Sequence, residues 1–186
     1  MLLSANAQKL NMQEDPVFSA AFYEPYEAAA AVCMEMLCGI RSRMPQDVIA
    51  LQYRLKSGAS IRGKLQRKRL PETAAAAAVA LHDIAGLRAV LSTRTAVYRC
   101  ADLLIANHAF SLEDVHDYIA SPKPSGYRSL HLIACVPVLL ASSVCAVPVE
   151  VQLRTASMDA WACAEHALIY KPSGQYPLTL PNRLTV

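Results

Sequence analysis

Residues 121–131 (SPKPSGYRSLH) gather into one short segment the side chains that a bound nucleotide needs. Pro122, Pro124 and Gly126 fix or free the backbone at close intervals, which is typical of a shaped loop. The segment also carries the cationic, aromatic and imidazole side chains of Lys123, Tyr127, Arg128 and His131. Cations pair with phosphates, and an aromatic ring stacks on a base. The alternative is an ordinary surface turn before the apolar run that follows.

A second candidate is the run VEVQLR that ends at Arg154, in which apolar and polar side chains alternate strictly. In a strand, that alternation places Glu150, Gln152 and Arg154 on one face of a sheet. A wet outer face is the commoner explanation of such a strand. The other explanation is a binding site, because Asp83 precedes another predicted strand and Arg88 lies within that strand, so both could be near this face.

Two carboxylates on neighbouring strands, Asp83 and Glu150, suit Mg²⁺, which prefers oxygen ligands and keeps substrate phosphates as further ligands. Lysines and arginines around such a centre would neutralise the charge that develops on a transferring phosphoryl group. The combination predicts a nucleotide-handling phosphoryl transferase. The sequence contains no Walker A pattern, no GxGxxG and no kinase HRD or DFG motif, which excludes the common ATP-binding folds.

Length and composition predict a single folded domain. The chain has 186 residues, of which 54% are hydrophobic and 18% charged, and this composition argues against disorder. The net charge of +3 is mild, but seven of the eighteen basic residues lie between positions 54 and 69 with no acidic residue among them. Such a cluster is usually a solvated face, and it also suits a polyanionic ligand.

The six cysteines contain no CxxC pair and have no histidine at zinc-finger spacing, so zinc binding is not expected. Most lie in apolar runs, where a free cysteine behaves as a small buried hydrophobe. The start does not resemble a signal peptide, so the expected location is the reducing cytoplasm. Residues 129–149 lack Asp, Glu, Lys and Arg, but Pro137 and Pro148 favour two short strands joined by a loop over a transmembrane helix.

Helical and extended patterns alternate along the chain, which predicts an α/β or α+β sheet domain. Helices are expected over residues 16–44, from Ser57 or Ser60 to about 71, from Thr73 to 81, over 95–107 and from Thr155 to 170. Strands are expected over residues 86–92, 115–119, 130–138 and 149–154.

Several short motifs occur in the order seen in RelA/SpoT-type alarmone synthetase domains, which the chain resembles over about residues 50–172. They are DIAGLR (83–88), DYI (117–119), PKPSGYRSLH (122–131), VEVQLRT (149–155), WACAEH (161–166) and YK (170–171). The ordered set is far more specific than any one motif. The chain therefore resembles a small alarmone synthetase without a hydrolase domain.

The resemblance implies an α+β, nucleotidyltransferase-like synthetase fold, with a mixed and mostly antiparallel sheet of about five strands flanked by helices. It divides the chain into an N-terminal helical segment (1–45), the synthetase domain (46–172) and a short C-terminal tail (173–186). The activity that it implies is transfer of the β,γ-pyrophosphate of ATP to the ribose 3′-hydroxyl of GDP or GTP, which releases AMP.

The resemblance also assigns roles to particular residues. Asp83 and Glu150 would be catalytic and would hold Mg²⁺, with activation of the acceptor hydroxyl as the alternative role of Glu150. The ATP-binding residues would be Arg54, Lys56, Lys64, Arg67 and Arg88, with the adenine between Arg54 and Arg88. The acceptor-binding residues would be Lys123, Tyr127, Arg128, His131, Gln152, Arg154, Glu165 and His166. Among these, Tyr127 would stack on the base, and for Gln152 and Arg154 a purely structural role is the alternative.

Three features depart from the family pattern. Gln52 and Tyr53 stand where a Thr/Ser–Gly pair is usual, which affects the donor side. His116 stands where Lys or Arg is more frequent, which affects binding of the acceptor phosphates. About fifteen residues follow Lys171, whereas the housekeeping small synthetases have a longer helical C-terminus that builds a tetramer. A tetramer is therefore not expected, while another homo-oligomer stays open.

Two alternatives compete with (p)ppGpp synthesis. A toxin-type synthetase would transfer pyrophosphate to an adenine nucleotide, giving (p)ppApp, or to the 3′ end of tRNA. A catalytically silent relative would bind nucleic acid through the basic cluster at 54–69. The presence of both Asp83 and Glu150 argues against the silent relative, which has no chemical need for two carboxylates.

Overall fold

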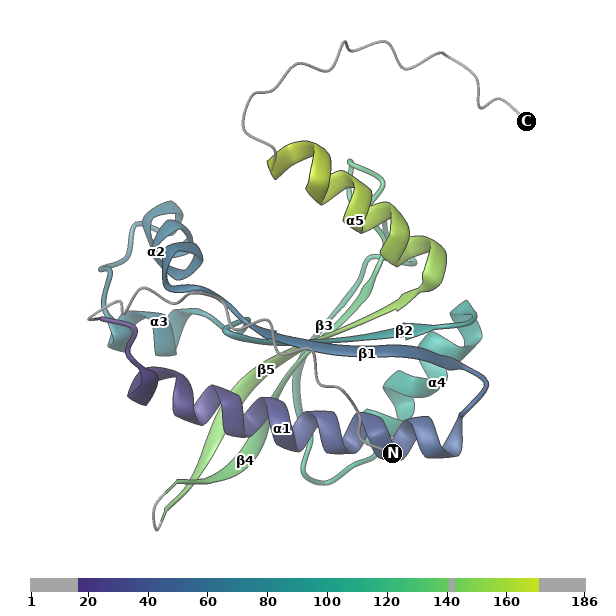
Figure 1. Cartoon of the computed structure of the whole chain (residues 1–186), viewed down its shortest axis with the longest axis horizontal. Coiled ribbons are helices and arrows are strands. Elements are labelled where there is room, and N and C mark those ends of the chain that lie inside the picture. The colour runs from purple at the N-terminus through teal and green to yellow at the C-terminus, as the bar shows by residue number, and fades with distance from the viewer. Residues whose placement is uncertain (1–16, 141–142, 171–186) are drawn as a thin grey trace, which may run out of the picture.

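A five-stranded sheet organises the computed structural model, which describes residues 17–140 and 143–170 (Figure 1). The helices are α1 (Ala20–Arg43), α2 (Gly58–Arg67), α3 (Ala74–Ala80), α4 (Arg94–Ile105) and α5 (Ala156–Tyr170). The strands are β1 (Val48–Leu55), β2 (Ala85–Leu91), β3 (Ser111–Asp117), β4 (Leu130–Leu140) and β5 (Ser143–Thr155). The expected tail at 173–186 and the first sixteen residues lie outside the described part of the chain.

The sheet has the order β1-β2-β5-β4-β3, and only β2 and β5 run parallel to each other. The expected mixed, mostly antiparallel sheet is therefore confirmed. The parallel pair places Gly86 opposite Glu150 and Arg88 opposite Gln152. Polar residues from two segments more than sixty positions apart are thus neighbours on one face.

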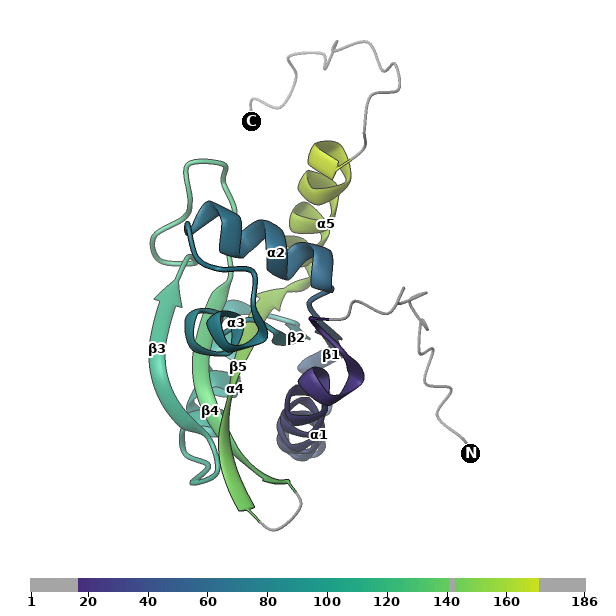
Figure 2. The same ribbon diagram turned by 90° about the vertical axis from the view of Figure 1, so that its left-hand side faces the viewer.

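The two faces of the sheet have different roles. Helices α1 and α4 pack on one face, where Val149, Val151 and Leu153 of β5 are fully buried. Helices α2 and α5 lie on the other side of the sheet (Figures 1 and 2). Because side chains alternate along a strand, the polar residues of β5 face this second side. The expected alternation is confirmed, and the polar face borders a cavity instead of forming a fully solvated surface.

Capping side chains set the starts of three predicted helices. The Ser57 Oγ accepts a hydrogen bond from the Ser60 backbone N–H at 3.3 Å, so Ser57 caps α2 and Ser60 lies inside it. Thr73 and Thr155 accept the corresponding bonds at the starts of α3 and α5. Each such cap typically contributes about 1 kcal/mol to stability.

Strand boundaries differ most from the sequence-based expectations. No strand was expected at β1, and β3 spans 111–117 in place of 115–119. β1 is an edge strand with Ile49 and Tyr53 exposed, so its sequence shows little of the burial pattern that marks an inner strand. β4 and β5 form the hairpin that was expected in place of a transmembrane helix. Within residues 17–140 and 143–170, no helix is long and apolar enough to cross a membrane.

The cysteines correct one expectation. All six are free, but only Cys33 and Cys100 are buried, so the idea that most of them are buried core residues is wrong. Cys38, Cys145 and Cys163 are exposed, and they lie on α1, β5 and α5, where Cys163 borders the cavity described below.

Candidate active site

A cavity of about 480 Å³ lies on the polar face of the sheet, bordered by β1, β2, β5 and α5. This volume is in the range of ligand-binding sites. Eight of the residues expected at the site line it: Arg54, Asp83, Arg88, Tyr127, Glu150, Gln152, Arg154 and Glu165. The sheet register is what brings them together, because it aligns β1, β2 and β5 side by side.

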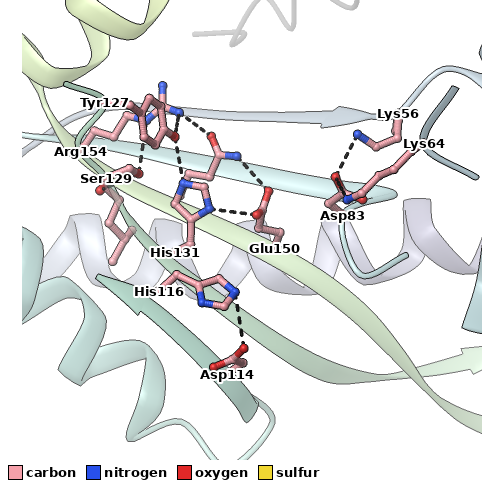
Figure 3. Close-up of polar contacts among 12 residues, drawn as sticks. Lys56, Lys64, Asp83, Asp114, His116, Tyr127, Ser129, His131, Glu150 and Arg154 are labelled. Carbon is pink, nitrogen blue, oxygen red and sulfur yellow. Dashed lines mark hydrogen bonds and ion pairs between the residues drawn. The ribbon is translucent and has the colours of Figure 1, made fainter. Parts of the chain in front are cut away.

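Asp83 lies directly before β2 and is held by two lysines (Figure 3). Its Oδ2 is 2.9 Å from the Lys56 Nζ and 2.8 Å from the Lys64 Nζ. Lys56 follows β1 and Lys64 lies on α2, so two separate elements direct ammonium groups at one carboxylate oxygen. Burial alone would raise the pKa of Asp83, but the hydrogen bonds from Lys64 and Lys56 outweigh it and lower that pKa. Asp83 is therefore an ionised carboxylate.

The second oxygen of Asp83 distinguishes this group from an ordinary ion pair. Its Oδ1 is buried and has no hydrogen-bond partner in the described part of the chain. A buried acceptor without a partner costs free energy unless another group satisfies it. Glu150 lines the same cavity, and the two like charges oppose each other enough to act on the pKa of Glu150.

The donor set fits Mg²⁺. Among the described residues there is no group of three or more His, Cys, Asp or Glu side chains that could hold a metal ion. Mg²⁺ is usually bound by one or two carboxylates together with water and substrate phosphates, and Asp83 and Glu150 supply that number.

Arg54 and Arg88 bring positive charge to the cavity from β1 and β2. The Arg88 Nη1 is 3.2 Å from the Asp159 Oδ1, whereas its Nε is buried without a partner. Burial lowers the pKa of Arg88, the nearby Arg154 and Arg54 lower it further, and Asp159 opposes them. A cation with an unsatisfied buried N–H is well suited to receive a polar or anionic ligand.

Five side chains on the other side of the cavity form a closed circuit of hydrogen bonds, here called the five-residue network (Figure 3). Its members are Tyr127, His131, Glu150, Gln152 and Arg154. His131 contacts the Tyr127 hydroxyl with Nε2 and the Glu150 Oε1 with Nδ1, both at 2.9 Å. Gln152 donates to the Glu150 Oε2 at 2.9 Å, and the Arg154 Nη2 donates to both Gln152 and Tyr127.

Two members of the five-residue network are more deeply buried than Asp83, whose side chain is 19% exposed. The side chain of Arg154 is 5% exposed and that of His131 is 9% exposed. Burial alone would raise the pKa of Glu150, but the hydrogen bonds from His131 and Gln152 lower it on balance. Glu150 is thus ionised, and each of its oxygens accepts one hydrogen bond from the network, which leaves further acceptor capacity on both oxygens.

The ring of Tyr127 is half-buried and has aromatic and cationic neighbours. Trp161 and Tyr118 lie edge-on to it, with ring centroids 6.5 and 6.0 Å away. The Lys123 Nζ lies 5.1 Å from the centroid of the Tyr127 ring. Gly126, the preceding residue, has φ +88°, and an added Cβ would lie 3.4 Å from Trp161. Glycine therefore supplies both the backbone conformation and the space that this loop needs.

The remaining predicted residues do not all reach the cavity. Arg128 donates to the backbone carbonyl of Ile119 and so supports the loop. Lys123 is exposed and contacts the Tyr118 and Tyr127 rings, and Arg67 is exposed on α2 outside the cavity lining. Of the two expected residues on α5, Glu165 lines the cavity, whereas the side chain of His166 lies outside what the structure describes.

Three further residues support the site without having been singled out from the sequence. The Asp159 Oδ1 is 3.2 Å from Nη1 atoms of both Arg88 and Arg154, so one carboxylate links the two sides of the cavity. The fully buried Ser129 accepts from the Arg154 Nε at 3.3 Å. Asp117 accepts from two backbone N–H groups, those of Ile119 and Ala120, and so shapes the turn after β3. Of these three residues, only Asp159 had a feature in the sequence that could have drawn attention to it, namely an acidic side chain in the first turn of a helix.

Comparisons with known proteins agree with this arrangement. Residues 53–175 match the family model described as the region found in RelA / SpoT proteins. The chain is 41% identical over 131 residues to GTP pyrophosphokinase YwaC of Bacillus subtilis, covering 70% of this chain and 62% of YwaC. It is 37% identical over 172 residues to GTP pyrophosphokinase YjbM of Bacillus subtilis, covering 88% of this chain and 78% of YjbM.

Solved structures are similar over most of the chain. The crystal structure of small alarmone synthetase 1 from Bacillus subtilis bound to its product pppGpp has a TM-score of 0.76 and 36% identity, covering 85% of this chain and 82% of that one. A structure of the same synthetase bound to AMPCPP has a TM-score of 0.70 and 33% identity, covering 85% and 81%. The expected synthetase fold is confirmed by these similarities.

Proposed function

Because this chain belongs to the RelA/SpoT family, we propose that it transfers the β,γ-pyrophosphate of ATP to the ribose 3′-hydroxyl of GDP or GTP, giving (p)ppGpp and AMP. The observation that carries the proposal is one cavity with two ionised carboxylates, cations on one side and an aromatic ring on the other. A phosphoryl transfer between two nucleotides needs one region that binds the donor phosphates and another that binds the acceptor.

The donor half combines Arg54, Asp83 and Arg88 of the cavity lining with Lys56 and Lys64, which lie outside the lining and pair with Asp83. The ammonium groups of Lys56 and Lys64, which both reach Asp83, would pair with the triphosphate of ATP once it binds. Arginine planes stack on bases, so the adenine fits between Arg54 and Arg88. Arg67, which is exposed on α2, would reach ATP phosphates only from the cavity rim.

Asp83 and Glu150 would hold Mg²⁺, which when bound supplies charge neutralisation to the transferring phosphates. The free oxygen of Asp83 is the position for it in this chain, because that atom is buried and unpaired. The lysines on the other oxygen keep Asp83 ionised before substrate arrives.

The acceptor half contains Tyr127 and the rest of the five-residue network. The base of the acceptor would stack on the Tyr127 ring, with Lys123, Arg128 and His131 near its phosphates or in support of the loop. Its 3′-hydroxyl oxygen would form a bond to the β-phosphorus of ATP while the bond from that phosphorus to the AMP oxygen breaks. Glu150, which lines the cavity, would take the hydroxyl proton.

Guanosine nucleotides are the acceptors that the comparisons support. The similar proteins are named GTP pyrophosphokinases, and one similar structure holds pppGpp. No observation favours adenine nucleotides, the tRNA 3′ end or a silent nucleic-acid binder over this acceptor. The cytoplasmic location and the expectation against a tetramer stay predictions.

A label-transfer experiment tests the proposal. The protein is incubated with γ-labelled ATP and Mg²⁺, and separately with GDP, GTP, ADP, ATP or tRNA as acceptor. Label should move to the guanosine nucleotides, with one AMP released for each product formed. Label on adenosine nucleotides or tRNA would move the acceptor assignment to the toxin-type reaction, and no transfer to any acceptor would remove the enzyme function.

A further inference from the structure

The Tyr127 hydroxyl is bonded on both sides inside the five-residue network, although stacking on a base uses only the ring. We propose that this hydroxyl is a positioning group for Glu150, acting through His131, so that one side chain both receives the acceptor base and helps orient the reactive carboxylate. This inference rests on the proposed function and adds a role that base stacking does not require.

Donor and acceptor chemistry fixes the direction of the bonds in the five-residue network except that between Tyr127 and His131, which depends on the tautomer of the imidazole. The guanidinium of Arg154 can only donate, so the Tyr127 oxygen and the Gln152 Oε1 accept from it. The Gln152 Nε2 must then donate to Glu150. Because the Glu150 carboxylate can only accept, the His131 Nδ1 carries a hydrogen, and when the imidazole is neutral its Nε2 accepts from the Tyr127 hydroxyl.

With a neutral His131, both branches of the circuit run in the same direction, from Arg154 to Glu150. One branch passes through Tyr127 and His131, and the other passes through Gln152. Bonds aligned in this way polarise one another and hold both oxygens of the carboxylate. Arg154 is itself fixed, since Ser129 and Asp159 accept from its other nitrogens. Arg154, where the hydrogen bonds start, is thus held by further partners, and Glu150, where they end, accepts from both branches.

The bond directions favour a positioning role over proton relay. A proton that Glu150 takes from the acceptor hydroxyl cannot pass to the His131 Nδ1, because that nitrogen already carries a hydrogen. What the Tyr127 hydroxyl can do is hold the imidazole in one orientation and one tautomer. His131 in turn holds the Glu150 Oε1, which leaves the remaining lone pairs of the carboxylate for the reaction.

The geometry also couples recognition to chemistry. The Tyr127 ring lies between its aromatic neighbours, while its hydroxyl reaches into the buried side of the network. A base stacked on the ring would restrict the same side chain whose oxygen holds His131. An acceptor that stacks poorly is then expected to lose turnover as well as affinity.

Two substitutions at Tyr127 separate ring from hydroxyl. Tyr127→Phe keeps the ring and leaves the His131 Nε2 and one Arg154 N–H without their partner. We expect kcat to fall about ten-fold, the usual scale for one unsatisfied buried polar group, with the KM for GDP changed by less than about two-fold. Tyr127→Leu removes the ring and should raise the KM for GDP as well. Tyr98→Phe, which removes a hydroxyl bonded to Asp117 outside the cavity, is the matched control and should keep both constants.

A double-mutant cycle tests whether the hydroxyl acts through His131. In the His131→Asn background, Tyr127→Phe should cost less than about two-fold in kcat, because the group that the hydroxyl positions is already absent. Nitrogen-15 NMR of the imidazole in the folded wild type should show hydrogen on Nδ1, and Tyr127→Phe should change the Nε2 resonance most. Thermal unfolding confirms that each variant is folded.

The outcomes distinguish this inference from the proposed function. If the wild type transfers pyrophosphate and Tyr127→Phe retains full kcat, or changes only the KM for GDP, the positioning role is wrong while the enzyme function stands. Independent, additive losses in the double mutant would also overturn it. If the wild type transfers nothing to any acceptor, the proposed function itself has failed.

Discussion

Asp83 and Glu150 face the same cavity and are both ionised, yet the protein holds them in contrasting ways. Asp83 has one oxygen between two lysines and the other without a partner. Glu150 has one oxygen bonded by the buried His131 and the other by the half-buried Gln152, and both of these side chains are hydrogen-bonded in turn. One carboxylate is held by two flexible lysines, and the other by side chains that belong to a closed hydrogen-bonded circuit.

The contrast has a physical reason. Lysine is a flexible point charge, so it can exchange a carboxylate for a phosphate at little conformational cost. The bonds around Glu150 are directional and lie away from water, where a displaced partner would leave buried polar groups unsatisfied. The donor half is therefore built to exchange partners when ATP and metal arrive, and the acceptor half to keep one geometry through the reaction.

The largest expected effect comes from Glu150→Gln. The substitution keeps size but removes the negative charge, and its amide N–H₂ would oppose a donor from either His131 or Gln152. We expect pyrophosphate transfer to fall by about a thousand-fold, the scale for loss of a general base, while the fold is kept. Label transfer and thermal unfolding measure the two effects. Near wild-type transfer would remove Glu150 from the mechanism, and the exposed Glu35→Gln controls for charge.

Asp83→Asn should have the next largest effect, and a different one. Lys56 and Lys64 lose their carboxylate, and the metal loses one ligand. We expect transfer to fall about a hundred-fold, with partial recovery at high Mg²⁺ that Glu150→Gln does not show. Titration of transfer against Mg²⁺ concentration checks this. A loss that Mg²⁺ does not relieve in either variant would contradict the difference between the two carboxylates.

Asp159→Asn should affect both halves, because its carboxylate pairs with Arg88 and Arg154. The substitution leaves two partly buried cations with less compensation, which we expect to lower the free energy of unfolding by about 1–3 kcal/mol. It should also raise the KM for ATP and lower kcat by several-fold each. Urea unfolding and steady-state kinetics measure these quantities. A change confined to one substrate would show that Asp159 serves only one half.

The smallest expected effect is on stability at acid pH. The pKa values of Asp83 and Glu150 are lowered from their ordinary 3.8 and 4.5 in the folded state. Their contribution is therefore complete above those ordinary values and is lost as the pH falls through the lower folded-state pKa values. Wild type should lose more free energy of unfolding than Asp83→Asn between pH 7 and about pH 3 in urea titrations. Equal losses would mean that Asp83 is not stabilised as an anion.

The local parts of this arrangement were predictable from the sequence. Strict alternation in VEVQLR placed Glu150, Gln152 and Arg154 on one face, and the Ser and Thr caps placed helix starts. β1 was not predictable in the same way, because it is an edge strand with exposed apolar residues, and its sequence therefore lacks the pattern of a buried strand. The sequence also could not show whether the polar face of β5 is solvated or lines a cavity, because that depends on the elements packed beside it.

The contacts inside the site were the harder part. Tyr127 and Arg154 are 27 residues apart, and the Tyr127 hydroxyl meets Arg154 only because β4 and β5 pair in one register. Asp159 was overlooked because an acidic residue in the first turn of a helix is explained equally well by the helix dipole. Side-chain chemistry suggests which residues belong to a site, whereas partners across a sheet depend on the fold.

Calorimetric titration of two variants tests the division of the cavity most directly. Lys56→Ala/Lys64→Ala and Tyr127→Leu are each titrated with GDP and, separately, with a non-hydrolysable ATP analogue in Mg²⁺. The lysine variant should bind the ATP analogue at least about ten-fold more weakly and GDP as the wild type does, and the Tyr127 variant should show the reverse pattern. If either variant weakens both ligands equally, or weakens the opposite one, the donor and acceptor halves are wrongly assigned.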